Sequence, residues 1–280
     1  MTTPDREFEK RAAALVGPTT EITLATARAF AGAGAKVALA GPDATARRDA
    51  ARVLATSGHP VVGVAGSART RAAADRMMLR VTEKLGGIDV LVAFFAPEYR
   101  GPAISTTATS WHHDVEGVLR SALFLAQAAV QVAPESGLSI VFVATADVFH
   151  AYPGRVTTAV SMTGLTGLSR ALAIELAHRN IRVNVVAGGP VETQRLREAL
   201  GREPHLLHRM EQRSPIGRLG TPEEIATVVR FIASRRASFM TGQVVRADGG
   251  WASLNQAPLG MKFSPGPLDL SQPSNAPPYR

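Results

Sequence analysis

Ala14-Leu15-Val16-Gly17-Pro18-Thr19-Thr20-Glu21-Ile22-Thr23 is the stretch of sequence that decides the fold. Its apolar run ends at Gly17 and a helical pattern follows, which predicts a strand at 12–16 that turns into a helix at 20–33. Further strands are predicted at 36–40, 61–64, 88–92, 139–144, 181–186 and 243–246, and further helices at 43–57, 71–85, 111–132, 157–179, 193–212 and from 222 onward. Ser110 is the predicted cap of the helix at 111–132, and Thr221 is the predicted cap of the helix from 222. This alternation predicts an α/β fold with a parallel, doubly wound sheet and helices on both faces.

The 280-residue chain has the length of one large domain that carries a tail. We assign 1–10 to an N-terminal lead, 11–251 to the α/β domain and 252–280 to a C-terminal tail. The tail is rich in proline and has little periodicity, so it cannot bury a core of its own. We expect it to be disordered or to lie as an extended arm across a neighbouring subunit.

The composition excludes several classes of protein. There is no cysteine, so neither a disulfide framework nor a thiolate metal site is possible. No apolar run is long enough to span a membrane and the N-terminus lacks the core of a signal peptide, so we expect a cytoplasmic protein without a membrane partner. The formal net charge is +8, but no basic run is interleaved with aromatic residues, which argues against a nucleic-acid partner. We interpret the arginine excess as a solvated surface; attraction to an acidic partner is the alternative.

Several motifs occur in the order that is typical of one family. They are Gly86-Gly87-Ile88-Asp89-Val90-Leu91-Val92, Ile181-Arg182-Val183-Asn184-Val185-Val186, Pro215-Ile216-Gly217-Arg218-Leu219-Gly220-Thr221-Pro222-Glu223-Glu224-Ile225, Phe239-Met240-Thr241-Gly242-Gln243 and Asp248-Gly249-Gly250. With these motifs the chain resembles the short-chain dehydrogenase/reductase family from residue 12 to about 251. The resemblance implies a Rossmann-type sheet and a nicotinamide cofactor at the carboxyl ends of its strands.

At most of the positions that the resemblance assigns to cofactor binding, this sequence differs from the family pattern. The family pattern TGxxxGxG retains only Gly17, and a carboxylate, Glu21, stands where the second glycine would face the pyrophosphate. Two unit charges about 4 Å apart repel by about 4 kcal/mol near a protein surface, although Glu21 would also stabilise the start of the helix beside a Thr19 or Thr20 cap. We therefore expect a degenerate site, in which this chain binds no cofactor tightly and a partner subunit holds NADP. The degenerate positions are Gly17, Glu21, Thr23, Pro42, Phe94 and Thr193.

The catalytic positions that the resemblance assigns are also altered. The tyrosine and lysine of the family's Y-x-x-x-K fall on Thr158 and Met162, the serine on Thr145 and the helix asparagine on Val118. In the family the tyrosine exchanges a proton with the substrate oxygen and the lysine lowers its pKa. Neither a threonine hydroxyl nor a thioether can do this near neutral pH, so we expect no hydride transfer by the family mechanism.

Other titratable residues leave an alternative open. Asp147, His150 and Tyr152 follow the predicted strand at 139–144 and could supply an acid and a base at the edge where such sheets bind ligands. Otherwise they are residues of a solvated loop. A group of four titratable residues at 112–116 lacks metal-ligand spacing and is interpreted as a solvated helix start, and we expect no metal site.

Two functional hypotheses follow. In the first, the chain is a non-catalytic subunit that assembles with a homologous active reductase, similar to the NovK-like subunits of aminocoumarin-pathway reductases. That likeness implies antibiotic biosynthesis on a β-hydroxy or β-keto acyl or aminoacyl group held on an acidic carrier protein, and a hetero-oligomer; a homo-oligomer is the alternative. In the second, the chain is an enzyme of the same fold that works without a cofactor as a dehydratase, isomerase or cyclase.

Overall fold

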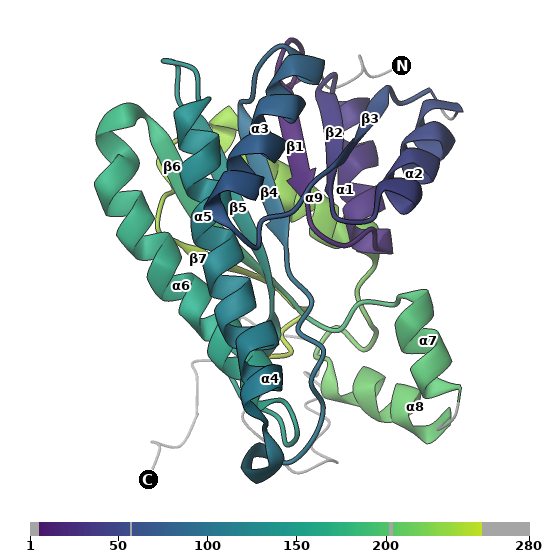
Figure 1. Ribbon diagram of the computed structural model, residues 1–280. Coiled ribbons are helices and arrows are strands. Elements are labelled where there is room, and N and C mark those ends of the chain that lie inside the picture. The colour runs from purple at the N-terminus through teal and green to yellow at the C-terminus, as the bar shows by residue number, and fades with distance from the viewer. Residues whose placement is uncertain (1–5, 57, 202–203, 254–280) are drawn as a thin grey trace, which may run out of the picture.

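The computed structural model describes residues 6–253 apart from 57 and 202–203, and it confirms the predicted α/β architecture. Seven parallel strands form one sheet in the order β3-β2-β1-β4-β5-β6-β7 (Figure 1). The strands are β1 Ala12–Val16, β2 Lys36–Gly41, β3 Val61–Ala65, β4 Val90–Phe94, β5 Leu138–Thr145, β6 Ile181–Gly188 and β7 Val244–Ala247. The predicted tail lies outside the described residues from 254 onward.

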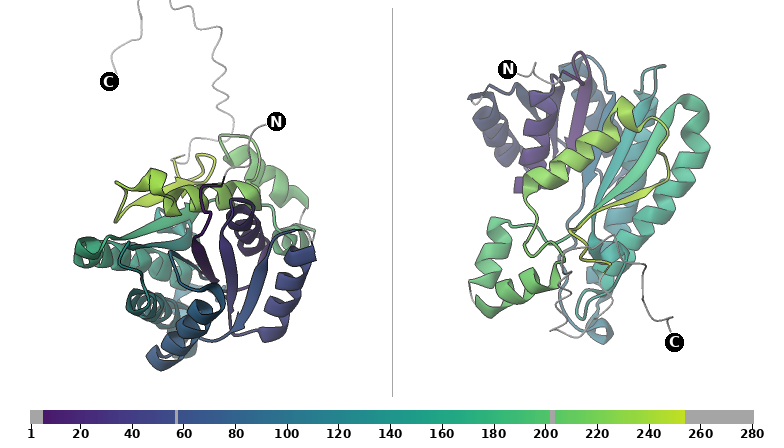
Figure 2. Two further views of the ribbon diagram at one scale, coloured as in Figure 1. Left: turned by 90° about the horizontal axis from the view of Figure 1, so that it is seen from above. Right: turned by 180° about the vertical axis from the view of Figure 1, so that it is seen from behind.

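Helices cover both faces of the sheet, as Figures 1 and 2 show. Helices α3, α5 and α6 pack on one face, and α1, α2 and α9 pack on the other. Helices α7 and α8 lie beyond the carboxyl edge of the strands (Figure 1). The longer helices are α1 Glu21–Gly32, α2 Ala44–Thr56, α3 Arg71–Leu85, α5 Gly117–Gln131, α6 Val156–Leu176, α7 Gln194–Leu200, α8 Pro204–Arg213 and α9 Pro222–Ala233. Among the described helices, none has the length and hydropathy needed to cross a bilayer.

The first turn forms as its sequence predicts. All five residues of β1 are buried, as expected for a central strand with helices on both sides. Gly17 has φ +142°, and a side chain there would overlap the carbonyl oxygen of Phe94 at the end of β4. The Thr20 hydroxyl accepts a hydrogen bond from the amide of Thr23 and caps α1, which confirms the predicted cap. Gly17 is therefore required by close backbone packing, whatever the turn binds.

The predicted helix at 111–132 is interrupted. Its first part is α4 Ala108–Trp111, a π-helical turn follows at His112–Glu116, and α5 begins afterwards. The prediction that Ser110 caps this helix is wrong, because the Thr107 hydroxyl accepts from the Ser110 amide and the helix starts one turn earlier. The predicted helix at 193–212 is likewise divided, into α7 and α8.

Part of the N-terminal lead packs into the core. Phe8 is completely buried, and its ring meets that of Phe30 on α1 edge to face, with 4.9 Å between the centroids. The Phe8 amide also donates to the carbonyl of Ala33 at 2.9 Å. The lead therefore contributes an aromatic side chain to the face of the sheet that α1 covers.

Candidate functional site

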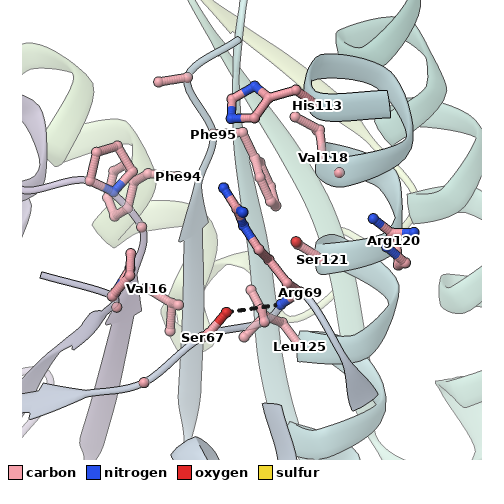
Figure 3. A pocket seen from close by; sticks show the side chains of 18 of the residues that line it. Val16, Ser67, Arg69, Phe94, Phe95, His113, Val118, Arg120, Ser121 and Leu125 are labelled. Atoms are coloured by element: carbon pink, nitrogen blue, oxygen red, sulfur yellow. Dashed lines mark hydrogen bonds between the residues drawn. The ribbon is translucent and has the colours of Figure 1, made fainter. Parts of the chain in front are cut away.

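A cavity of about 560 Å³ opens at the carboxyl ends of β1, β2, β3 and β4 (Figure 3). Its wall combines the first turn at Gly17 with the turns that follow the next strands, at 41–42, 66–69 and 94–96, and with residues of α4 and α5. The structure thus brings together Gly17, Pro42 and Phe94, three of the predicted cofactor positions. Open parallel sheets bind their ligands at this edge.

Arg69 gives the cavity positive charge. The described lining also includes Arg120, His112 and His113 but no carboxylate, and the two histidines contact Glu116 and Asp114 behind it. Arg69 points into the cavity, on whose wall Phe94 and Phe95 also lie (Figure 3). It has no ion-pair partner in the described part of the chain. Such a lining favours a ligand with negative charge and a flat apolar part.

A second arginine lies beneath the first turn. Arg47 of α2 is 2% exposed and donates hydrogen bonds to the carbonyl of Gly17, to the hydroxyl of Thr19 at 3.1 Å and to the carbonyl of Asp43 at 3.2 Å. Burial lowers its pKa from the ordinary arginine value, but a guanidinium stays protonated in proteins. Gly41 leaves room for it, since a side chain there would overlap the guanidinium. The sequence gives no strong signal for this contact, because Arg47 lies inside a helix.

Glu21 faces a helix outside the cavity. Its Oε1 atom accepts from the amide of Gln194, the first residue of α7, at 2.6 Å and lies 3.6 Å from Nη2 of Arg197. Thr193 caps the same helix through a hydrogen bond from the Leu196 amide. Thr23, another predicted cofactor position, donates its hydroxyl hydrogen to the carbonyl of Pro18. Glu21 and Thr193 therefore come together at the junction of α1 and α7, apart from Gly17 and Phe94.

The four positions that the resemblance assigns to catalysis have different surroundings. Thr158 and Met162 both belong to α6; Thr158 is 1% exposed, and Met162 is completely buried in the core. The hydroxyl of Thr158 accepts from Nη1 of Arg100 at 3.4 Å, and the hydroxyl of Thr145 donates to Asp147 at 2.5 Å. Val118 lies on the wall of the cavity. Both hydroxyls thus have a charged partner from this chain.

The other candidates gather beyond β5 in two groups, which Arg155 connects because its guanidinium also lies 5.9 Å from the ring centroid of Tyr152. Asp147 is buried and pairs with Arg155 at 3.0 Å. The hydroxyl of Tyr152 forms hydrogen bonds with Nε2 of His150 and Nε1 of Trp251. Burial lowers the pKa of His150 and raises that of Tyr152, so both are neutral near pH 7. The structure therefore joins Tyr152 to His150 and assigns Asp147 to a different partner.

Sequence reasoning missed two further members of the Tyr152 group. The guanidinium of Arg213, the last residue of α8, lies 5.2 Å from the ring centroid of Tyr152 and 4.6 Å from that of Trp251. Both contacts join segments that are distant in the sequence, which leaves no local pattern to detect. The group connects α8 and the turn after β7 to the loop after β5.

Asp114 overturns the interpretation of residues 112–116 as a solvated helix start. It is 1% exposed and accepts from the amides of Glu98 and Tyr99 at 3.0 and 2.8 Å and from the hydroxyl of Thr157 at 2.8 Å. His113 also contacts it, with 2.9 Å between Nδ1 and Oδ1. The π-helical turn directs this carboxylate inward, where it fastens the loop after β4 to the start of α6.

Comparisons with known proteins identify relatives over almost the whole domain. Residues 17–252 match the family described as enoyl-(acyl carrier protein) reductase. Dehydrogenase/reductase SDR family member 4 of Sus scrofa is 31% identical over 256 residues, which cover 89% of each chain. A probable 2,4-dienoyl-CoA reductase of Bacillus subtilis is 30% identical over 246 residues, which cover 87% of this chain and 97% of the relative.

The comparisons also correct the expectation that this chain binds no cofactor tightly. A gluconate 5-dehydrogenase of Burkholderia cenocepacia, solved in complex with NADP and tartrate, has the same fold with a TM-score of 0.81 and 24% identity, over 90% of this chain and 99% of that one. The structure shares the fold, and it is the match to a reductase family and to a curated reductase, both of nicotinamide-dependent oxidoreductases, that contradicts the expectation. Its physical error was to count the charge of Glu21 at the first turn without the opposite charges of Arg47 and Arg197.

Three observations agree on the family of this chain: the order of its strands, the cavity at their carboxyl ends and the family match. The match spans most of the 280 residues, and both curated relatives are at least 30% identical over more than four-fifths of their length. The chain therefore belongs to the short-chain dehydrogenase/reductase family of oxidoreductases.

Proposed function

We propose that this chain is a cofactor-binding subunit of a short-chain oxidoreductase and that a second, catalytically complete chain supplies the proton transfer. The single observation that carries the proposal is the burial of Thr158 and Met162 at the positions assigned to the tyrosine and lysine. A threonine hydroxyl has no accessible pKa near 7, and a thioether carries no proton to give. If a hydride is transferred to a substrate at this site, α6 therefore offers no side chain that can donate the accompanying proton.

The cavity supports the cofactor half of the proposal. The adenosine end of a dinucleotide in this fold lies over the turns after β1, β2 and β3, and these turns form the wall described above. Arg69 in the cavity supplies the positive charge that a phosphorylated ribose requires. This charge favours NADP over NAD, although Pro42 stands where the resemblance places an arginine.

The names of the relatives support an acyl thioester as the substrate of the complex. One relative is a probable dienoyl-CoA reductase, and the matching family is described by an acyl-carrier-protein substrate. A net charge of +8 would attract an acidic carrier protein. We therefore propose a β-hydroxy or β-keto acyl or aminoacyl group on a carrier protein, in antibiotic biosynthesis, as the substrate of the mixed assembly.

The test combines binding with turnover. The purified chain is titrated with NADPH and NADH by fluorescence, and it is assayed for NADPH oxidation with β-keto acyl thioesters, alone and after co-expression with a homologous reductase that has an intact Y-x-x-x-K. We expect tighter binding of NADPH than of NADH, no turnover by the chain alone, and a stable complex with the partner. Turnover by the chain alone would refute the division of roles, and failure to bind NADPH would refute the cofactor site.

The Tyr152 group favours a second candidate, in which this chain catalyses a reaction itself. A neutral tyrosine can give its hydroxyl proton to a substrate oxygen, and the indole N–H of Trp251, which donates to the Tyr152 oxygen, can stabilise the phenolate that remains. Tyr152→Phe distinguishes the candidates, because it removes this proton and keeps the ring beneath Arg213. If the chain alone shows turnover that Tyr152→Phe abolishes, the second candidate replaces the first.

A further inference from the structure

Thr145 stands where β5 reaches the carboxyl edge of the sheet. It is the last residue of β5 and pairs in register with Gly188, the last residue of β6. Thr145 is partly exposed, whereas all the residues of β5 before it are buried. The strand beside β5 is β4, whose last residue, Phe94, lines the cavity. Thr145 therefore lies one strand beyond the cavity, on the edge at which open parallel sheets bind their ligands.

The hydroxyl hydrogen of Thr145 is held by a buried carboxylate. The hydroxyl donates to Oδ2 of Asp147 at 2.5 Å, and the same Oδ2 atom lies 3.0 Å from Nη2 of Arg155. Asp147 is 4% exposed, and nothing in the described part of the chain donates to its other oxygen, Oδ1. A buried carboxylate with one unpaired oxygen is strongly destabilised when it loses another donor. The hydrogen of Thr145 therefore stays on Asp147.

This hydrogen bond decides what Thr145 can offer to a ligand. A hydroxyl group has one hydrogen to donate and two lone pairs that accept. Because the hydrogen is committed to Asp147, only the lone pairs of the Thr145 oxygen remain, and no described residue donates to them. An alcohol can donate its O–H to this oxygen. A ketone oxygen carries lone pairs only, so it would face Thr145 as a second acceptor.

We infer that Thr145 and Asp147 select the alcohol form of the substrate, a β-hydroxy acyl group, over the β-keto form. Thr145 accepts the hydrogen bond of the substrate hydroxyl, and Asp147 is a positioning residue that acts through Thr145. The inference rests on the proposed function, since it takes the substrate to be an acyl thioester bound at this edge. It deepens that function by choosing between the two oxidation states of the substrate.

The experiment compares two ligands that differ in this one group. The full chain, saturated with NADP⁺, is titrated calorimetrically with the N-acetylcysteamine thioesters of β-hydroxybutyrate, as separate enantiomers, and of acetoacetate. We expect the better β-hydroxybutyryl enantiomer to have a Kd about tenfold lower than the acetoacetyl ligand, which corresponds to about 1.4 kcal/mol. Thr145→Val removes the acceptor and should bring the two Kd values within about twofold. Thr145→Ser keeps the hydroxyl and should keep the preference.

Variants of Asp147 test its action through Thr145. Asp147→Ala releases the hydroxyl hydrogen, so the acetoacetyl ligand should bind about fivefold more tightly than it binds the wild type. Asp147→Asn is the matched control, because its amide oxygen can accept from both Thr145 and Arg155 and should keep the wild-type ratio. Circular dichroism shows whether each variant is folded; if Asp147→Ala is not, Thr145→Val decides.

Three results would overturn the inference. They are equal or tighter binding of the acetoacetyl ligand by the wild type, an unchanged preference in Thr145→Val, and an unchanged preference in a folded Asp147→Ala. A chain that binds NADP⁺ but neither thioester would also overturn it and would leave the cofactor site standing. A chain that does not bind NADP⁺ would instead refute the proposed function.

Discussion

Replacing Asp114 should destabilise the protein more than a typical surface substitution, although no reaction is assigned to this residue. Asp114 is 1% exposed and accepts hydrogen bonds from the amides of Glu98 and Tyr99 and the hydroxyl of Thr157. Asp114→Ala leaves the buried hydroxyl of Thr157 and two partly buried backbone amides without their acceptor, and a buried unpaired group costs about 1–3 kcal/mol. Because water can enter the vacated space, we expect the free energy of unfolding to fall by about 4 kcal/mol.

Urea denaturation monitored by circular dichroism measures this loss, with Asp114→Asn as the control that keeps the size of the side chain. The amide retains one acceptor oxygen, so the expected loss is about 2 kcal/mol. Burial raises the pKa of Asp114, but the hydrogen bonds from His113, Glu98, Tyr99 and Thr157 lower it by more, so that it lies below the ordinary value. The carboxylate therefore stabilises the fold above about pH 4, and this stabilisation is lost as the pH falls further. A loss below about 1 kcal/mol for Asp114→Ala would refute the reasoning.

Three further predictions concern the fold. Gly17→Ala should cost at least about 2 kcal/mol or prevent folding, because a side chain would overlap Phe94 at φ +142°, and thermal unfolding measures this loss. Phe8→Ala should cost about 3 kcal/mol in urea denaturation, since its ring is fully buried; an effect near zero would place the lead outside the core. Hydrogen bonds from Arg218 and the Thr221 amide hold the pKa of Glu224 at about 2, so Glu224→Gln should lose less than about 1 kcal/mol at pH 7 and converge with the wild type between pH 4.5 and 2.

The sequence predicts those features of the fold that depend on residues close together in the chain. Thr20 caps α1 and Thr221 caps α9, because a hydroxyl at that position meets an amide only three residues away. The alternation of strands and helices likewise led to the correct sheet, since each strand is a short apolar run. Ser110 failed as a cap because its neighbour Thr107 offers the same hydroxyl one turn earlier.

The site was less predictable, because its charges come from distant segments. Glu21 appeared as an isolated negative charge at the first turn, whereas Arg47 lies under that turn and Arg197 beside the carboxylate. Asp114 looked solvated because its partners at 98–99 and 157 belong to other elements. Motif positions identify which residues have changed, but the position of Arg69 in the cavity depends on neighbours that are distant in the sequence.

The most direct test of the central claim is native mass spectrometry of this chain, co-expressed with a homologous reductase that has an intact Y-x-x-x-K, in the presence of NADPH. We predict a mixed oligomer that carries one cofactor for every chain, because both kinds of subunit bind NADPH and the partner completes the proton transfer. Separate homo-oligomers, or a mixed oligomer with cofactor only in the number of partner chains, would contradict the account.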